Sequence, residues 1–239
     1  MKIIELTGVT KSNEITVSKG ISSLIIATSL ALTDFLNEKI SIYIERANGN
    51  NVPIANKVKL QDFLLSATYG GEAIHSDGSF PTIAVCEIAL DGAILLQEKE
   101  NIKISLEDLR APNTYAIYGV EHPLNTNNLM HWEQKSCAIE DLSKKIDVKG
   151  YDLAVIDLNN TVTDISYTYS NGQTIKYDPF ELRALSVDVD PIQSIKNGIV
   201  SSRIGDKLCL PLVNVDFIDV NKNQGSIVNF VMRSVQTEA

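Results

Sequence analysis

The chain contains one pattern of residues twice, and this internal repeat is the feature that most constrains its fold. Each copy has an alternating segment, an Asn-Gly pair, a second short segment and a phenylalanine. These are Ile40–Ile44, Asn48-Gly49, Val58–Leu60 and Phe63 in the first copy, and Ile165–Tyr169, Asn171-Gly172, Ile175–Tyr177 and Phe180 in the second. Alternation predicts a strand, and Gly supplies the positive φ of a turn. Each copy therefore predicts a strand, a turn, a second strand and a short helix.

The two copies are far apart in the chain, because Val58 and Ile175 are separated by about half of its 239 residues. A repeat of this size indicates two similar domains in tandem, each of an ordinary domain size. We predict domains at residues 1–121 and 138–239, joined by a linker over residues 122–137. The linker is predicted to be irregular because it is polar, and its Trp132 is expected to pack onto one domain.

Most of the remaining sequence predicts strands, which are rich in Ile, Val, Thr and Tyr and bounded by Gly, Asn, Asp and Pro. The predicted strands are Glu14–Val17, Ser23–Leu30, Lys39–Glu45, Pro53–Leu60, Thr82–Leu90, Ile94–Gln97, Asn101–Leu106 and Thr114–Val120 in the first half, and Lys145–Val148, Tyr151–Leu158, Asp164–Ser170, Gln173–Tyr177, Lys207–Val220 and Ser226–Val235 in the second. Asp91-Gly92 predicts a hairpin turn. Short helices are expected at Gln61–Thr68 and from Pro179 to about Leu185, the second one capped by Asp178.

About eight short strands per half favour an all-β fold of two tandem eight-stranded jelly-roll barrels with short helices. A pair of immunoglobulin-like sandwiches is the alternative, but the paired Cys and intervening Trp of that family are missing from the sequence. A parallel βαβ fold is disfavoured because the predicted helices are few and short.

The net charge of −9 and the pI near 4.9 argue against direct binding of nucleic acid, which needs clustered Lys and Arg. Cys86, Cys137 and Cys209 form no CxxC pair, so we expect reduced thiols in a chain made in a cytoplasm, with Cys86 in the core. The first residues lack the apolar stretch of a signal peptide, and Ile21–Leu32 is too short to span a bilayer. We therefore expect a soluble chain without a targeting segment.

The sequence predicts no catalytic, cofactor-binding or metal-ligating residue, and no cofactor. Its histidines do not form the His-x-His pair that metal-dependent cupins use. His75-Ser76-Asp77 has the residue types of a triad, but adjacency in sequence is not triad geometry, and no Gly-x-Ser-x-Gly elbow accompanies it. No glycine-rich phosphate loop occurs. Because these catalytic motifs are missing, we predict a protein that is not an enzyme.

Two acidic segments are weak candidates for calcium. Asp219-x-Asn221-x-Asn223-x-Gly225 resembles the start of a calcium loop, but the twelfth position is Phe230 instead of Glu, so a hairpin is preferred. Asp188 and Asp190 could contact a cation, although two carboxylates before a proline usually serve only solvation. Neither segment is predicted to be a metal site.

With its two repeat units, the chain resembles the major capsid proteins of the double jelly-roll lineage, in particular the compact versions in lipid-containing icosahedral bacteriophages of the corticovirus and finnlakevirus type. The units that carry the resemblance are Lys39–Glu45, Asn48-Gly49, Val58–Leu60 and Asp62–Leu65, and then Asp164–Tyr169, Asn171-Gly172, Ile175–Tyr177 and Asp178–Leu182. In those proteins a strand, a turn, a strand and a Leu-rich helix likewise recur in each barrel. The first copy departs from the second by a longer connection between Asn48 and Val58.

The resemblance implies a structural virion protein. It implies homotrimers that form pseudo-hexagonal capsomers of an icosahedral shell over an internal membrane, assembled in the host cytoplasm. The implied partners are neighbouring capsomers, minor capsid or vertex proteins and the internal viral membrane, with no direct nucleic acid. Lys2, Lys11 and Lys19 either meet anionic headgroups or only keep the surface soluble.

Two other classes of function stay open at the level of sequence. One is a receptor- or carbohydrate-binding β-sandwich module, such as a phage spike or vertex protein, although sugar sites favour exposed aromatic residues and these total only 6% of the chain. The other is a cupin-like or β-sandwich enzyme, against which the missing His pair counts.

Overall fold

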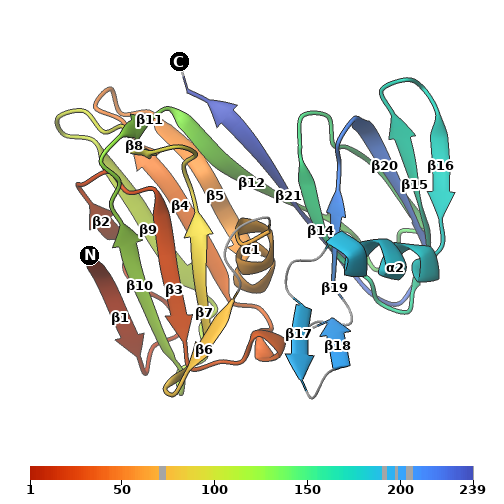
Figure 1. The fold of residues 1–239 in the computed structure, drawn as a ribbon, viewed down its shortest axis with the longest axis horizontal. Helices are drawn as coiled ribbons and strands as arrows, with labels where there is room; N and C mark the ends of the chain where they lie inside the picture. The colour runs from red at the N-terminus through yellow and green to blue at the C-terminus, as the bar shows by residue number, and fades with distance from the viewer. Residues whose placement is uncertain (70–73, 190–192, 197–198, 203–206, 239) are drawn as a thin grey trace. The chain divides into compact units, whose positions relative to one another are not determined.

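The structure is a computed structural model that describes residues 1–69, 74–189, 193–196, 199–202 and 207–238 (Figure 1). It divides into two compact units, Met1–Glu133 with Val235–Ala239 (unit 1) and Gln134–Ser234 (unit 2). Strands dominate both units, so the all-β prediction is confirmed. None of the helices formed by the described residues has the length and apolarity needed to cross a membrane.

Unit 1 holds the first copy of the repeat and most of the predicted strands of the first half. Its elements are β1 (Lys2–Thr7), β2 (Ile15–Val17), β3 (Ser23–Thr28), a 3-10 turn (Leu32–Asp34), β4 (Lys39–Glu45), β5 (Asn51–Lys59), α1 (Leu60–Ala67), β6 (His75–Asp77), β7 (Phe80–Glu87), β8 (Ala93–Ile94), β9 (Asn101–Glu107), β10 (Thr114–Val120), β11 (Asn125–Thr126) and the start of β12 (Asn128–Cys137).

Most successive strands of unit 1 lie in different sheets, and β4 and β5 are the main exception. One sheet has the order β1-β10-β3-β7-β6, and in the other β5, β4, β9 and β2 are neighbours in that order. With β6 and the short β8 and β11 set aside, the first sheet takes the first, eighth, third and sixth strands, and the second sheet takes the remaining four. This arrangement is the strand order of a jelly roll. Burial alternates along β4 and β9, where Ile42, Ile44 and Ile104 are fully buried, so one face of this sheet forms core.

Unit 2 repeats this order with a second set of strands. Its elements are the end of β12, β13 (Ser143–Asp147), β14 (Leu153–Asp157), β15 (Val162–Tyr169), β16 (Thr174–Tyr177), α2 (Pro179–Val189), β17 (Gln193–Lys196), β18 (Ile199–Ser202), β19 (Lys207–Pro211), β20 (Val215–Lys222) and β21 (Val228–Thr237), of which β21 ends in unit 1. One sheet has the order β13-β20-β15-β16, and in another β19, β14, β21 and β12 are neighbours in that order. Their core includes Ile165, Ile218 and Phe230.

The predicted repeat is present in both units as an antiparallel strand pair followed by a helix. β4 and β5 lead into α1, and β15 and β16 lead into α2 (Figure 1). The longer connection in the first copy is not a loop but strand β5, which has nine residues where β16 has four. Register shifts beside Ile42 and a positive φ at Lys57 show where β5 absorbs the extra residues.

Several sequence predictions are wrong in ways that the jelly-roll order explains. Asp91-Gly92 does not join a hairpin, because β8 pairs with β11 and not with β7. The segment before Ser226 is not a hairpin either, because β20 and β21 lie in different sheets. The predicted strand Lys207–Val220 is two strands, β19 and β20, which also lie in different sheets. Neighbours in sequence are mostly not neighbours in these sheets.

Two larger predictions also need correction. Part of the segment predicted to be irregular, residues 128–137, is the ten-residue strand β12, and the buried side chains of Leu129, Trp132 and Cys137 explain its order. The two predicted eight-stranded jelly-roll barrels are confirmed in strand order but not as barrels, because their sheets are not closed. Closure would require the outer strands of each unit's two sheets to pair, and no such pairing connects the strands that the structure describes.

Candidate functional site

The first Asn-Gly turn follows β4 and is closed by three hydrogen bonds. The Gly49 N–H donates to the Arg46 carbonyl at 2.9 Å, and the Arg46 N–H donates to the Asn50 carbonyl at 2.9 Å. The Asn48 side-chain Oδ1 accepts the Asn50 N–H, also at 2.9 Å. Gly49 has a φ of +83°, which glycine adopts at no steric cost.

The second Asn-Gly turn follows β15 and has the same bonds. The Gly172 N–H donates to the Tyr169 carbonyl at 2.8 Å, and the Tyr169 N–H donates to the Gln173 carbonyl at 2.9 Å. Asn171 Oδ1 accepts the Gln173 N–H at 2.9 Å, and φ of Gly172 is again +83°. The two copies therefore match down to individual hydrogen bonds, and their differences in side chains mark what is specific to each unit.

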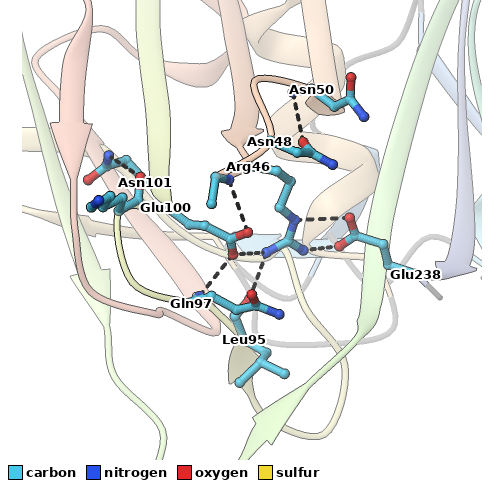
Figure 2. Close-up of polar contacts among 10 residues, drawn as sticks. Arg46, Asn48, Asn50, Leu95, Gln97, Glu100, Asn101 and Glu238 are labelled. Carbon is cyan, nitrogen blue, oxygen red and sulfur yellow. Dashed lines mark hydrogen bonds and ion pairs between the residues drawn. The ribbon is translucent and has the colours of Figure 1, made fainter.

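In unit 1 the turn carries Arg46, whose guanidinium joins two carboxylates (Figure 2). Its Nε donates to Glu238 Oε1 at 3.0 Å and its Nη2 donates to Glu238 Oε2, so this pair is bidentate. Its Nη1 donates to Glu100 Oε2 at 2.7 Å and to the Leu95 carbonyl at 2.9 Å. Burial by itself would lower the pKa of Arg46, but the bonds to Glu238 and Glu100 outweigh it and raise that pKa.

Glu100 is buried and is fixed by backbone as well as by Arg46. The Gln97 N–H donates to its Oε2 at 2.9 Å and the Ala47 N–H donates to its Oε1 at 3.2 Å. The bond from Gln97 is the largest cause that lowers the pKa of Glu100, and the bonds from Arg46 and Ala47 lower it further against the effect of burial. Glu100 therefore stays ionised beside the arginine.

A hollow of about 320 Å³ lies beside this cluster. Its lining is mostly polar and consists of Arg46, Ala47, Asn48, Leu95, Gln97, Glu100, Asn127 and Glu238. The amides of Asn48, Gln97 and Asn127 can both donate and accept hydrogen bonds. The hollow is thus a polar site with one cation and two anions, none of which belongs to a histidine or a thiol.

In unit 2 the position equivalent to Arg46 is Tyr169, and the surroundings are aromatic. Tyr167 is buried, with its ring centroid 5.3 Å from that of Tyr177 and 6.3 Å from that of Tyr169. The hydroxyls of Tyr169 and Tyr177 are 3.4 Å apart. Burial, followed by the neighbouring Tyr177, raises the pKa of Tyr169 to about 12. These rings pack on the core, so they do not form the exposed aromatic platform that a sugar site requires.

The two repeat-equivalent phenylalanines have opposite environments. Phe63 is fully buried in α1, and its ring centroid lies 4.7 Å from that of Trp132. Trp132 is itself buried and donates its indole N–H to Ser66 Oγ at 2.9 Å, which confirms that it packs onto one domain. Phe180 in α2 is 79% exposed. Phe63 is the fourth residue of α1, whereas Phe180 is the second residue of α2, in which the fourth residue, Leu182, is the fully buried one.

The residues that sequence motifs singled out are not brought together. His75, Ser76 and Asp77 lie in the exposed strand β6. His122 contacts the backbone of Leu124. His131 contacts the Pro53 carbonyl. No group of three or more His, Cys, Asp or Glu side chains suited to a metal occurs within the part of the chain that the structure describes.

The two calcium candidates have different outcomes. Asp219 and Asn221 lie within β20, where Asn221 Nδ2 donates to Asp164 at 2.7 Å, so this segment is strand and not a calcium loop. Asp190 lies outside the described residues, so the pair with Asp188 is not described. Cys86 is fully buried, as expected, and burial raises the pKa of its thiol.

The sequence reasoning missed the Arg46 cluster. Glu100 and Glu238 lie 54 and 192 residues from Arg46 in the chain, and neither belongs to a motif. The repeat could have drawn attention to the position, because Arg46 precedes the first Asn-Gly pair where a tyrosine precedes the second.

The architecture defines a class, because the chain has the fold of the double jelly-roll major capsid proteins. It is similar to the major capsid protein P2 from Bacteriophage PM2, with a TM-score of 0.58 and 8% identity over 100% of this chain and 95% of that one. It is also similar to a chain in the atomic structure of Sulfolobus Turreted Icosahedral Virus, with a TM-score of 0.60 and 9% identity over 99% and 90%. The expected resemblance is confirmed at the level of the fold. No protein-family model and no curated protein matches the chain.

Proposed function

We propose that the chain is a structural virion protein, the major capsid protein of an icosahedral shell. The observation that carries the proposal is the correspondence over the full chain with a major capsid protein, in which all of this chain and 95% of the other are matched at once. A likeness confined to one jelly roll would be weak support, since that fold serves many functions.

The proposed unit of assembly is a homotrimer. Each copy would contribute two similar jelly-roll domains, residues 1–121 and 138–239, joined by residues 122–137. Three copies would then present six similar domains around one axis and form a pseudo-hexagonal capsomer. The matching turns, strand orders and helices in the two units support this reading, because similar units can make similar lateral contacts.

The proposed surroundings are a virion with an internal membrane, neighbouring capsomers and minor capsid or vertex proteins, assembled in the host cytoplasm. The N-terminal lysines give the membrane contact little support. Lys2 pairs with Glu5 at 2.7 Å, Lys11 pairs with Glu107 at 3.1 Å, and Lys19 pairs with Glu121. Each lysine is thus offset by a carboxylate, which favours the reading that these lysines only keep the surface soluble.

The first test is the mass of the purified protein in solution, measured by light scattering at several concentrations. The proposal predicts trimers of three times 26.3 kDa or larger shell-like particles, with hexagonal outlines in electron micrographs. A folded protein that stays monomeric at every concentration would overturn it. That result would favour a binding module, and screening against glycans would follow. Circular dichroism with a β-rich spectrum is the control that the measured protein is folded.

A further inference from the structure

The capsid proposal gives no role to the hollow beside Arg46. One side of that hollow is nevertheless preorganised, because hydrogen bonds hold Arg46 and Glu100 in place. Arg46 Nη1 is held by Glu100 and by the Leu95 carbonyl, and Glu100 is itself held by the Gln97 and Ala47 N–H groups. None of these bonds involves Glu238. The plane of the guanidinium is therefore fixed by residues 46–47 and 95–100, and its Nε–Nη2 edge is left to face the Glu238 carboxylate (Figure 2).

Glu238 occupies that edge from a segment that is otherwise on the surface. Val235, Gln236 and Thr237 are exposed, whereas Glu238 is half-buried. Two polar contacts accompany the Glu238 carboxylate on the surface of unit 1. The Glu238 N–H donates to the Asn127 carbonyl at 2.9 Å, and Thr237 Oγ1 donates to Asn128 Oδ1 at 2.8 Å. Of the three contacts, only the one between the Glu238 carboxylate and Arg46 joins charged groups.

We propose that the hollow around Arg46 is a carboxylate-binding site, and that Glu238 is its tethered ligand. The two N–H groups on one edge of a guanidinium match the two oxygens of a carboxylate, which makes such pairs geometrically selective. Glu100 already balances the charge of Arg46, so hydrogen-bond geometry, and not net positive charge, selects the ligand. A dianion such as phosphate is disfavoured because, together with Glu100, it would place three negative charges around the single positive charge of Arg46.

The chemical class of the ligand is a monocarboxylate on a short aliphatic stem. Leu95 lines the hollow together with the amide residues Asn48, Gln97 and Asn127, and Glu238 enters it on a two-carbon stem. A glutamate side chain provides such a stem, and propionate is its free counterpart. The site does not depend on the capsid function, so the two proposals can fail independently.

The test uses the full chain with Glu238→Ala, which empties the edge of Arg46. Propionate is titrated against chloride at equal ionic strength, and the Nε–H resonance of Arg46 is followed by NMR. The expected result is a saturable return of that resonance toward its wild-type position. Propionate at ten times its Kd is also expected to raise the midpoint of thermal unfolding of the variant by about 3 °C. Wild-type protein should show neither response, because Glu238 fills the site.

A second variant separates binding from a general effect of the anion. Arg46→Lys with Glu238→Ala keeps a cation beside buried Glu100 but removes the two-pronged edge. Its unfolding midpoint should not respond to propionate beyond the response to chloride. An equal thermal response in the single and double variants, or a titration of Glu238→Ala that leaves the Arg46 resonance unmoved, would overturn the proposal. Light scattering of the same samples reads the assembly state separately.

Discussion

Gly49 and Gly172 have a φ of +83°, a region in which the Cβ of any L-residue approaches its own backbone carbonyl. An added Cβ would meet no other atom within 4 Å at either position, so the strain of substitution is confined to the backbone. We predict that Gly49→Ala and Gly172→Ala each lower the free energy of unfolding by about 1 kcal/mol. Urea denaturation followed by circular dichroism measures the change.

Gly78 provides the matched control for these two turns. An added Cβ at Gly78 also meets nothing within 4 Å, but the φ of Gly78 is not positive. Gly78→Ala should therefore change the free energy of unfolding by no more than about 0.5 kcal/mol. Equal losses for all three variants would show that the positive φ is not the cause.

At Glu100 the relevant property is charge. Its pKa is lowered, first by the Gln97 N–H and then by Arg46, so the folded protein binds its proton less readily than the unfolded chain does. Its contribution to stability is complete above the unfolded pKa of about 4.3 and is lost as the pH falls through the lower folded value. We predict that Glu100→Gln costs about 2 kcal/mol at pH 7 and less below pH 4, in urea titrations across that range.

The control for Glu100 is a carboxylate in an exposed ion pair. Glu5 pairs with Lys2 at 2.7 Å, and both side chains are well exposed. Glu5→Gln should cost no more than about 1 kcal/mol at pH 7, since exposed pairs contribute little. A loss for Glu100→Gln that is constant from pH 7 to pH 3 would contradict the role assigned to its charge.

At the scale of elements, α1 and α2 follow equivalent strands but bury their phenylalanines differently. Phe63 is fully buried against Trp132, and Phe180 is 79% exposed. We predict that Phe63→Ala lowers the free energy of unfolding by about 3–5 kcal/mol, whereas Phe180→Ala changes it by no more than about 0.5 kcal/mol. Thermal and urea unfolding of the two variants check this pair directly. Similar losses would mean that Phe180 is covered in the protein in solution.

The start of α2 gives a second prediction at this scale. Asp178 Oδ1 accepts the N–H groups of Phe180 and Glu181 at 2.8 and 2.9 Å, and Glu181 Oε2 accepts the Asp178 N–H at 2.9 Å. This reciprocal pair is a capping box, with Pro179 at the first helical position. Asp178→Ala should cost about 1 kcal/mol, and Asp178→Asn should retain most of the stability because it still accepts the bonds. Urea denaturation distinguishes the two substitutions.

The sequence predicts an element correctly where the residues of that element alone determine its structure. Lys39–Glu45 and Thr114–Val120 have the predicted bounds, and α1 differs from Gln61–Thr68 by one residue at each end. The cap at Asp178 is confirmed for the same reason. In contrast, β12 was predicted to be irregular because its polar residues dominate the pattern, although Leu129, Trp132 and Cys137 supply a buried face.

The pairing of strands and the contacts between residues far apart in the chain are harder to predict from the sequence. Asp91-Gly92 has the local signature of a hairpin, but a jelly roll sends most successive strands to different sheets, so a local turn signal does not decide which strands pair. The burial of Phe63 and the exposure of Phe180 cannot be read from residues that are identical in type. Likewise, Arg46 meets Glu100 and Glu238 only after folding, so no local spacing reveals the hollow.

At the scale of the whole molecule, the net charge of −9 sets the electrostatic repulsion between copies. Copies that associate in a shell bring like charges together, and this repulsion acts over the Debye length, which falls from about 30 Å at 0.01 M salt to about 10 Å at 0.1 M. We predict that association of this protein strengthens with sodium chloride over that range, so that light scattering shows the larger mass at a lower protein concentration.

Sucrose at matched osmolality is the control, because it changes the exclusion of solute from the protein surface without screening charge. The mass in sucrose should stay closer to that at 0.01 M salt. The opposite trend, in which salt dissociates the assemblies, would show that complementary charged patches hold the copies together and outweigh the repulsion between the whole chains. In that case the exposed ion-pairing residues, and not the apolar positions such as Phe180, would be the first targets for mapping the contacts between copies.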